Sequence, residues 1–302
     1  ANIGVVLVPQ NMSLGLEAFA RAIEASDIKH FIVWHALVPD LEAIRKNSLE
    51  NQSIWVSVGE ADEQAVAGYL KFSCLLNSPV DDQLGLHYIS SEQAFILTMT
   101  SGSTGDPKPI VLSQSVKEKR AKAAIELYGV TSQDVVLIAT PMYHSLAERL
   151  LLMPLLIGGT CVIMSGYTAQ KWIKTVNKTK VSFSIIVSSQ LKQVVSLLAL
   201  SGERLDSLRC IVSSSERLSD AIRDRVLQLF CCDFHECYGT SEIAIATNLN
   251  YQYAYVNSVG RAIHHFDVKI IGENRQLLNA GEEGEIICKT PMLFSGYYKK
   301  QC

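Results

Sequence analysis

Residues 100–108 read TSGSTGDPK, and the rest of the chain can be interpreted as the support of this short segment. An apolar run at 94–99 precedes it and another at 110–112 follows it, and both runs are typical of strands bounded by a turn. Two glycines, four hydroxyl side chains and a lysine suit a loop whose backbone N–H groups and hydroxyls face an anion. An ordinary Ser/Gly-rich hairpin loop with an exposed lysine is the alternative at this point.

The spacing of this segment excludes a Walker-type phosphate loop, which requires G-x-x-x-x-G-K-[ST] and a helix directly after it. Counted from Gly102, the second glycine of that pattern would fall on Pro107, and Pro109 occupies the position of the required hydroxyl. A proline fixes φ and removes a backbone donor, so we expect a stiff exit from the loop. Any phosphate binding here must therefore use a different arrangement.

The composition predicts a globular chain without a global positive field. The 302 residues are 48% hydrophobic and 19% charged, with a formal net charge of −3. These values exclude a disordered chain and argue against nucleic acid as a partner, so anionic ligands would be held locally. No apolar run reaches the ~18 residues of a membrane span. The opening run at 3–9 is too short for a secretory signal and predicts a first strand.

The 8 cysteines do not follow the paired spacing of a metal site. We therefore expect buried, reduced thiols and a cytoplasmic protein.

Strand and helix patterns alternate through the middle of the chain. Strand-like runs lie at 135–139, 161–164, 181–187, 208–212 and 233–237, and helical patterns lie at 148–157, 169–177, 190–200 and 220–230. A capping box that begins at Ser115 predicts a further helix that ends at Tyr128. The alternation predicts an α/β fold with βαβ units and a mainly parallel sheet. We divide the chain into an α/β subdomain at 1–93, an α/β subdomain at 94–247 that carries the loop, and a β-rich subdomain at 248–302.

Chemically versatile side chains follow three of the predicted strands. The strand at 135–139 leads to Tyr143-His144. The strand at 208–212 leads to residues 213–216 (SSSE), and the strand at 233–237 leads to residues 238–242 (YGTSE). Parallel sheets bind ligands in the crevice beyond the carboxyl ends of their strands. Each segment alone is compatible with a plain loop, but three that converge on one crevice predict a binding site.

These segments resemble the motifs of the adenylate-forming superfamily, which contains acyl-CoA and aryl-CoA synthetases. Residues 100–108 match the signature T-S-G-[ST]-T-G-x-P-K, and residues 238–242 match Y-G-x-T-E with serine in place of threonine. Residues 214–216 align with a G-G-E turn in which serines replace both glycines, and residues 141–144 match P-[LM]-[FY]-H. Segments 258–261 and 284–298 resemble the later S-V-G-R and G-E-[LI]…G-Y-Y motifs.

The resemblance implies layered α/β/α sheets with a small β-rich subdomain, and an AMP-forming acid–CoA ligase. Its substrates would be ATP with Mg²⁺, a small carboxylic acid, and CoA or a carrier-protein thiol. His144 would lie near the acyl carboxylate, and Glu242 would hold Mg²⁺. The nucleotide would be bound at its pyrophosphate portion by Thr100, Ser101, Gly102, Ser103, Thr104, Gly105 and Lys108, and elsewhere by Ser214, Ser215, Glu216, Tyr238, Gly239, Thr240 and Ser241. Of these, His144, Glu242 and Lys108 would take part in catalysis.

Members of this superfamily continue into a Y-[RK]-T-G-D segment and a mobile C-terminal lid that carries a catalytic lysine. Neither follows before Cys302. We therefore expect impaired turnover from these residues by themselves, with a separate lid domain as a possible partner. Two alternatives stay open at this point: a catalytically silent relative that binds nucleotide or a partner, and an unrelated flavodoxin-like phosphate binder.

Overall fold

The computed structural model describes residues 4–48, 53–59, 68–79, 90–101, 107–253 and 258–299. The chain divides into two compact units, and each is described by itself below. The smaller unit combines Ala1–Val111 with Gly296–Cys302, and the larger unit is Leu112–Ser295. The division at residues 93 and 247 that the sequence suggests stays a prediction.

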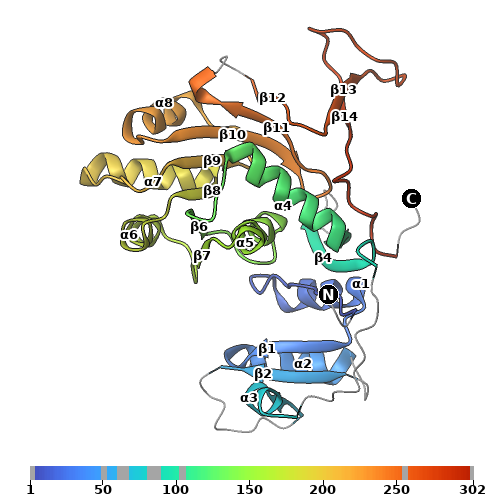
Figure 1. The fold of residues 1–302 in the computed structure, drawn as a ribbon. Coiled ribbons are helices and arrows are strands. Elements are labelled where there is room, and N and C mark those ends of the chain that lie inside the picture. Colours follow the sequence, from blue (N-terminus) through green and yellow to red (C-terminus); the bar gives the residue numbers. More distant parts are fainter. Residues whose placement is uncertain are drawn as a thin grey trace. The chain divides into compact units, whose positions relative to one another are not determined.

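The smaller unit contains a short parallel sheet with helices packed on it (Figure 1). Phe31 and Trp55 form its centre, with their rings stacked 4.0 Å apart, and Phe19 and Ile23 of the first helix pack against the same cluster. Its elements are β1 (His30–Trp34), η1 (His35–Leu37), β2 (Ile54–Val58), β3 (Leu70–Lys71), α1 (Leu16–Ser26), α2 (Val38–Ser48) and α3 (Phe72–Leu76).

The predicted strand at 3–9 is wrong within its described residues. Leu7 alone forms an isolated bridge, in which its N–H donates to the carbonyl of Phe95 at 3.0 Å. Gly4 adopts φ 71°, outside the extended region, and Pro9 has no N–H to donate. Gly4 and Pro9 therefore limit the strand pairing of this segment to Leu7 in its middle.

The strands on either side of the TSGSTGDPK loop are present and longer than predicted. They are β4 (Ala94–Ser101) and β5 (Pro107–Ser113), which pair in a two-stranded sheet. The segment near the end of the chain also pairs with β5: the N–H of Val111 donates to the carbonyl of Gly296 at 2.9 Å, and the N–H of Tyr298 to that of Pro109 at 2.8 Å. The G-Y-Y motif therefore has an architectural role in the smaller unit.

The larger unit is built on a mainly parallel sheet, as the sequence predicts (Figure 1). The strand order is β12-β11-β10-β9-β8-β6-β7, in which β10 to β7 run parallel and β11 and β12 are antiparallel additions at one edge. The strands are β6 (Val135–Ile138), β7 (Thr160–Ile163), β8 (Phe183–Val187), β9 (Cys210–Ser214), β10 (Asp233–Thr240), β11 (Ala244–Asn250) and β12 (Arg261–Ala262), and the turn η2 (Tyr251–Tyr253) follows β11.

Helices cover both faces of this sheet. Successive side chains of a strand point to opposite faces, and here both faces are apolar and must be buried. Leu137 of β6 packs with α6, α7 and α8 in one cluster, whereas its neighbours Val136 and Ile138 pack with α4 and α5 in another. The helices are α4 (Gln114–Tyr128), α5 (Ser145–Ile157), α6 (Ala169–Thr179), α7 (Ser188–Ser201) and α8 (Asp220–Leu229). A hairpin of β13 (Asp267–Ile271) and β14 (Glu285–Lys289) follows the sheet.

The start of α4 differs from the predicted capping box. Its N-cap is Ser113, whose hydroxyl accepts a hydrogen bond from the N–H of Val116 at 3.1 Å. Ser115 already lies inside the helix. Two serines separated by one residue offer two possible caps, and strand β5 fixes the choice because it ends at Ser113.

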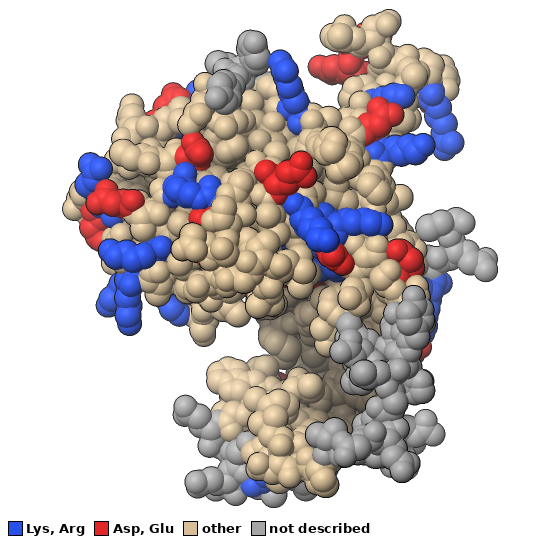
Figure 2. All heavy atoms as spheres, in the orientation of Figure 1, with Lys and Arg blue, Asp and Glu red and all other residues tan. Residues whose placement is uncertain are grey.

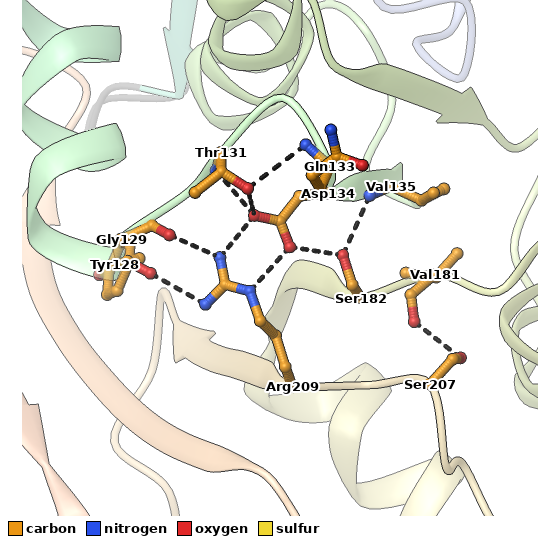
Figure 3. Close-up of polar contacts among 10 residues, drawn as sticks. All are labelled: Tyr128, Gly129, Thr131, Gln133, Asp134, Val135, Val181, Ser182, Ser207 and Arg209. Carbon is orange, nitrogen blue, oxygen red and sulfur yellow. Dashed lines mark hydrogen bonds and ion pairs between the residues drawn. The ribbon is translucent and has the colours of Figure 1, made fainter.

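A polar cluster joins the amino ends of the parallel strands, at the edge opposite to the strand-end motifs (Figure 3). Asp134, just before β6, accepts hydrogen bonds from Arg209 just before β9 and from the hydroxyl of Ser182 just before β8. Burial raises the pKa of Asp134, but the hydrogen bonds from Arg209, Ser182 and the Thr131 backbone outweigh it and lower this pKa to about 2. The carboxylate thus stays charged and holds three strands in register.

Acidic and basic side chains are interspersed on the face of the molecule that Figure 2 shows. This distribution agrees with the small net charge and gives no large basic patch on that face. Within the described residues, every helix is too short or too polar to cross a membrane.

Candidate functional site

A cavity of about 260 Å³ opens at the carboxyl edge of the sheet in the larger unit. One wall comes from the first turns of α5, where Ser145, Leu146 and Arg149 line it. Residues four apart lie on the same face of a helix, so Ser145 and Arg149 face the cavity together. His144 is the N-cap residue of α5, directly before the first lining residue, and its ring lies 4.4 Å from that of Tyr143.

The turn after β9 forms a second wall with Ser214 and Ser215. Ser215 adopts φ 77°, the left-handed region that favours glycine, which is consistent with the G-G-E turn that this segment resembles. Two buried side chains hold the turn in place. The hydroxyl of Ser188 lies 2.6 Å from the carbonyl oxygen of Glu216, and the carboxylate of Glu236 accepts the N–H of Leu218 at 3.0 Å.

The hairpin from β10 to β11 closes the cavity with Gly239, Thr240 and Ser241. The pairing shifts by one residue between Tyr238 and Gly239, which produces a bulge at this point. A Cβ on Gly239 would overlap the backbone oxygen of Ala244, so only glycine fits there. The bulge turns the chain so that the backbone of the strand end lines the cavity.

Arg120 of α4 fixes the position of this hairpin from behind. Its buried guanidinium donates to the carbonyl oxygens of Met292 at 2.9 Å, of Ser241 at 2.8 Å and of Glu242. Burial and the neighbouring Arg149 lower the pKa of Arg120 to about 9, which reflects how completely the charge is removed from water. Tyr238 is half-buried and packs beside a cluster of Ala246, Phe266 and Met292. Tyr238, Glu242, Glu216 and His144 are thus sequence neighbours of lining residues and are not themselves in the lining.

The TSGSTGDPK loop belongs to the smaller unit. Thr100 and Lys108 lie at its base, where the hydroxyl of Thr100 donates to the carbonyl of Lys108 at 3.0 Å. Ser101 ends β4. The candidate residues Gly102, Ser103, Thr104 and Gly105 lie outside the described residues. The structure therefore brings together the candidates of the larger unit, and it leaves the loop as a separate prediction.

Two histidines are biased towards the neutral form, one next to the cavity lining and one in the first half of β10. Burial lowers the pKa of His144, although Glu148 acts in the opposite direction. Burial also lowers the pKa of His235 on β10, whose Nδ1 lies 3.0 Å from the side-chain nitrogen of Asn248. A neutral His144 could accept a hydrogen bond from a ligand at the start of α5.

The sequence reasoning missed several side chains that build this site. Ser145 and Arg149 line the cavity, and Ser188, Glu236 and Arg120 hold its walls. Ser145 and Arg149 could have been found, because Ser145 directly follows Tyr143-His144 and Arg149 lies one helical turn further along. The other three act across elements, and no local pattern marks them.

A family model described as AMP-binding enzyme matches residues 1–298. The chain belongs to the AMP-binding enzyme family. Among its curated relatives, the indoleacetate–CoA ligase of Aromatoleum aromaticum is 25% identical over 244 residues, which cover 76% of this chain and 46% of the relative. The feruloyl-CoA synthase of an Amycolatopsis species is 23% identical over 299 residues, which cover 98% of this chain and 57% of the relative. The chain therefore spans about half the length of the curated relatives it matches.

Solved structures confirm the fold of the chain. The anthranilate CoA ligase AuaEII in complex with anthranoyl-AMP gives a TM-score of 0.89 at 20% identity, over 99% of this chain and 58% of that one. The o-succinylbenzoate CoA synthetase of Bacillus subtilis in complex with AMP gives 0.81 at 21% identity, over 98% and 57%. The predicted α/β class and the predicted family are both confirmed, and the alternative of an unrelated flavodoxin-like binder is excluded.

Proposed function

We propose that the protein activates a carboxylic acid with ATP and transfers the acyl group to CoA. A carboxylate oxygen attacks the α-phosphorus of ATP and displaces pyrophosphate, which gives an acyl-adenylate. The sulfur of a thiol then attacks the acyl carbon and displaces AMP. The observation that carries the proposal is the cavity at the carboxyl edge, lined by hydroxyl groups of two strand-end motifs that the family resemblance assigns to the nucleotide.

The residues proposed for nucleotide binding form two groups. In the larger unit, Ser214 to Glu216 and Tyr238 would bind the adenine, with Gly239 and Thr240 lining its approach and the Ser241 hydroxyl reaching a phosphate. In the smaller unit, residues 100–105 and Lys108 would hold the pyrophosphate portion. Hydroxyls and a lysine suit phosphate oxygens because they supply donors and positive charge.

Glu242 is the proposed ligand of a magnesium ion. Magnesium at nucleotide sites is held by one or two carboxylates together with substrate phosphates, and a single half-buried carboxylate beside two hydroxyl residues fits this donor set. No three His, Cys, Asp or Glu side chains gather to hold a metal by themselves in the described part of the chain. When bound with the nucleotide, the ion would neutralise phosphate charge. The part of Glu242 would be to orient it beside the hydroxyl of Ser241.

His144 is the proposed contact of the acyl carboxylate. It caps α5 next to the cavity wall, and a lowered pKa favours the neutral ring at physiological pH. A neutral ring can orient a carboxylate through its N–H without forming a tight ion pair. It would therefore leave the carboxylate oxygen free to attack phosphorus.

For the 302 residues by themselves we propose nucleotide binding with little turnover, since the lid lysine of the family would complete the chemistry. One feature favours a silent, binding-only relative as a second candidate. Ser214 and Ser215 replace two glycines of the motif, and the left-handed backbone of Ser215 is less favourable for serine. We further propose a cytoplasmic location, which the free thiols among the described cysteines support.

The proposal is tested by thermal shift of the 302-residue chain with AMP and with ATP and Mg²⁺, at millimolar ligand. We expect both ligands to raise the melting temperature, and Ser241→Ala to reduce the shift. Ser207→Ala is a matched control, because Ser207 donates to the carbonyl of Val181 at the opposite end of the sheet (Figure 3). Carboxylate-dependent exchange of labelled pyrophosphate into ATP then separates an active enzyme from a silent one. The absence of a shift with either nucleotide would contradict the proposal.

A further inference from the structure

Arg149 is a buried cation in the wall of the cavity. The residue is 7% exposed, and its Nε has no hydrogen-bond partner. Leaving a buried charged donor unpaired costs free energy, so native proteins rarely retain one without a function. An arginine at this position is therefore expected to meet a ligand.

Two further buried polar groups without a hydrogen-bond partner belong to residues that line the same cavity. The hydroxyls of Ser145 on α5 and of Ser214 at the end of β9 are buried and lack hydrogen-bond partners. Both residues line the cavity together with Arg149. Three residues that line one cavity, from two separate elements, thus each carry a buried donor without a partner. Water could satisfy the two hydroxyls, but it cannot neutralise the guanidinium.

The acidic residue that favours the charge of Arg149, Glu148, is shared with a second buried cation. The adjacent acidic residue, Glu148, forms an ion pair with Lys117 at 2.6 Å, and these two side chains are 5% and 3% exposed. Two neighbouring groups that could become anions, the Cys237 thiol and the Tyr128 hydroxyl, stay protonated at neutral pH. Burial raises the pKa of the Cys237 thiol to about 11, and burial raises the pKa of Tyr128 well above its usual value. Arg120, the other buried arginine at the site, is directed at three backbone carbonyls.

We propose that the carboxylic acid carries a second carboxylate, and that Arg149 with the hydroxyl of Ser145 binds this second group at the α5 wall of the cavity. The inference rests on the proposed acid activation and names its substrate class. A guanidinium matches a carboxylate through paired N–H donors, and a buried pair of this kind discriminates strongly against a methyl group in the same place.

The test compares matched acids of equal length with the 302-residue chain: succinate with butyrate, glutarate with pentanoate, and adipate with hexanoate. Binding is measured by calorimetry and by thermal shift. We expect at least one diacid to bind about 10- to 100-fold more tightly than its partner, as one or two hydrogen bonds to a charged group provide. Arg149→Met should remove this preference and leave the monoacid affinity within a few-fold. Arg149→Lys should keep part of it.

Folding and nucleotide binding provide the controls. Without ligand, Arg149→Met should melt at the same temperature as the natural protein or higher, because it removes a buried charge. Arg204→Met, at an exposed ion pair with Asp206, controls for the substitution itself. The thermal shift with AMP should persist in Arg149→Met. This shift reports on the proposed nucleotide site independently of Arg149.

Each contrary outcome has a separate meaning. If the natural chain responds to AMP but binds diacids no better than monoacids, the inference is overturned and the proposed function stands. If Arg149→Met loses the AMP shift, Arg149 serves the nucleotide phosphate and the inference is again overturned. If Arg149→Met and Arg149→Lys both melt far below the natural protein, the arginine is structural and the inference fails. If the natural chain responds to neither nucleotide, the proposed function itself fails.

Discussion

Arg209 and Asp134 form a two-point ion pair across the sheet, with Nε and Nη2 of the arginine each 2.7 Å from a carboxylate oxygen. The same guanidinium donates to the carbonyl oxygens of Tyr128 and Gly129, which end α4. A single arginine therefore joins the start of β9, the start of β6 and the end of a helix. The binding cavity lies at the other end of these strands, so this pair stabilises the frame without taking part in the site.

The Asp134 carboxylate should make the stability of the larger unit depend on acid. Its folded pKa of about 2 is lower than the ordinary value of 3.8, so its contribution of about 2 kcal/mol is complete above pH 4 and is lost as pH falls towards 2. Asp134→Asn should lower the free energy of unfolding by about 2–3 kcal/mol at pH 7. It should also flatten the decline between pH 4 and 2, as urea denaturation at a series of pH values would measure. Asp206→Asn, at an exposed pair, should change little; an equal effect of both variants would contradict this assignment.

The branched set of N–H donors on the Arg120 guanidinium should contribute more to stability than its positive charge. Arg120→Lys keeps the positive charge but cannot reach the carbonyls of Met292, Ser241 and Glu242 together, so we expect a loss of about 2–3 kcal/mol in unfolding free energy. The thermal shift with AMP should shrink as well, because the hairpin that lines the cavity is released. Arg225→Lys, on the exposed face of α8, is the matched control. Equal melting temperatures for the two lysine variants would show that the carbonyl contacts contribute nothing.

The backbone at Ser215 predicts a stabilising substitution inside the site. Ser215→Gly removes the penalty of a side chain at φ 77° and loses some of the gain to the greater freedom of glycine in the unfolded chain. The net effect should be a rise of about 0.5–1 kcal/mol in unfolding free energy. Ser214→Gly should destabilise instead, since Ser214 is not in the left-handed region and ends a strand. Differential scanning calorimetry compares the two variants. A lower melting temperature for Ser215→Gly than for the natural protein would contradict backbone strain at Ser215.

Gly239 should tolerate no side chain. Because a Cβ there would overlap the carbonyl of Ala244, Gly239→Ala must open the bulge between β10 and β11. We expect a loss of roughly 2–4 kcal/mol in stability and loss of the AMP shift, by analogy with other overpacked buried sites. Gly15→Ala, where nothing lies within 4 Å of the added carbon, should change the melting temperature little. Normal AMP binding by Gly239→Ala would contradict the close approach of Gly239 to the carbonyl of Ala244.

The architecture of the larger unit could be predicted from the sequence because local pattern and tertiary position agree there. The run at 135–139 is apolar throughout, as a strand covered on both sides must be, and it became β6 with helices on both faces. The errors lie where two local signals compete. Ser113 and Ser115 are both good caps, and Leu7 sits in an apolar run that Gly4 and Pro9 interrupt.

The candidate site could be located from the sequence but not completed. The strand-end rule pointed to residues 213–216 and 238–242, and both segments supply lining residues. Arg149 was missed because in the sequence it is one charged residue in an amphipathic-looking helix. Its burial depends on how α5 packs against α4 and the strands β6, β7 and β8, which no pattern within the helix reveals. The roles of the TSGSTGDPK residues stay predictions.

The hydrogen bond between Val111 and Gly296 joins two positions far apart in the sequence and close in space. The segment between them, Leu112–Ser295, is one uninterrupted stretch of chain and a compact unit with its own core. Its entry and exit points are therefore adjacent, which is the topology of an inserted module. A module with neighbouring ends can be excised or recloned without spanning a gap, and joining Val111 to Gly296 by a short linker would leave the remaining unit with a continuous chain.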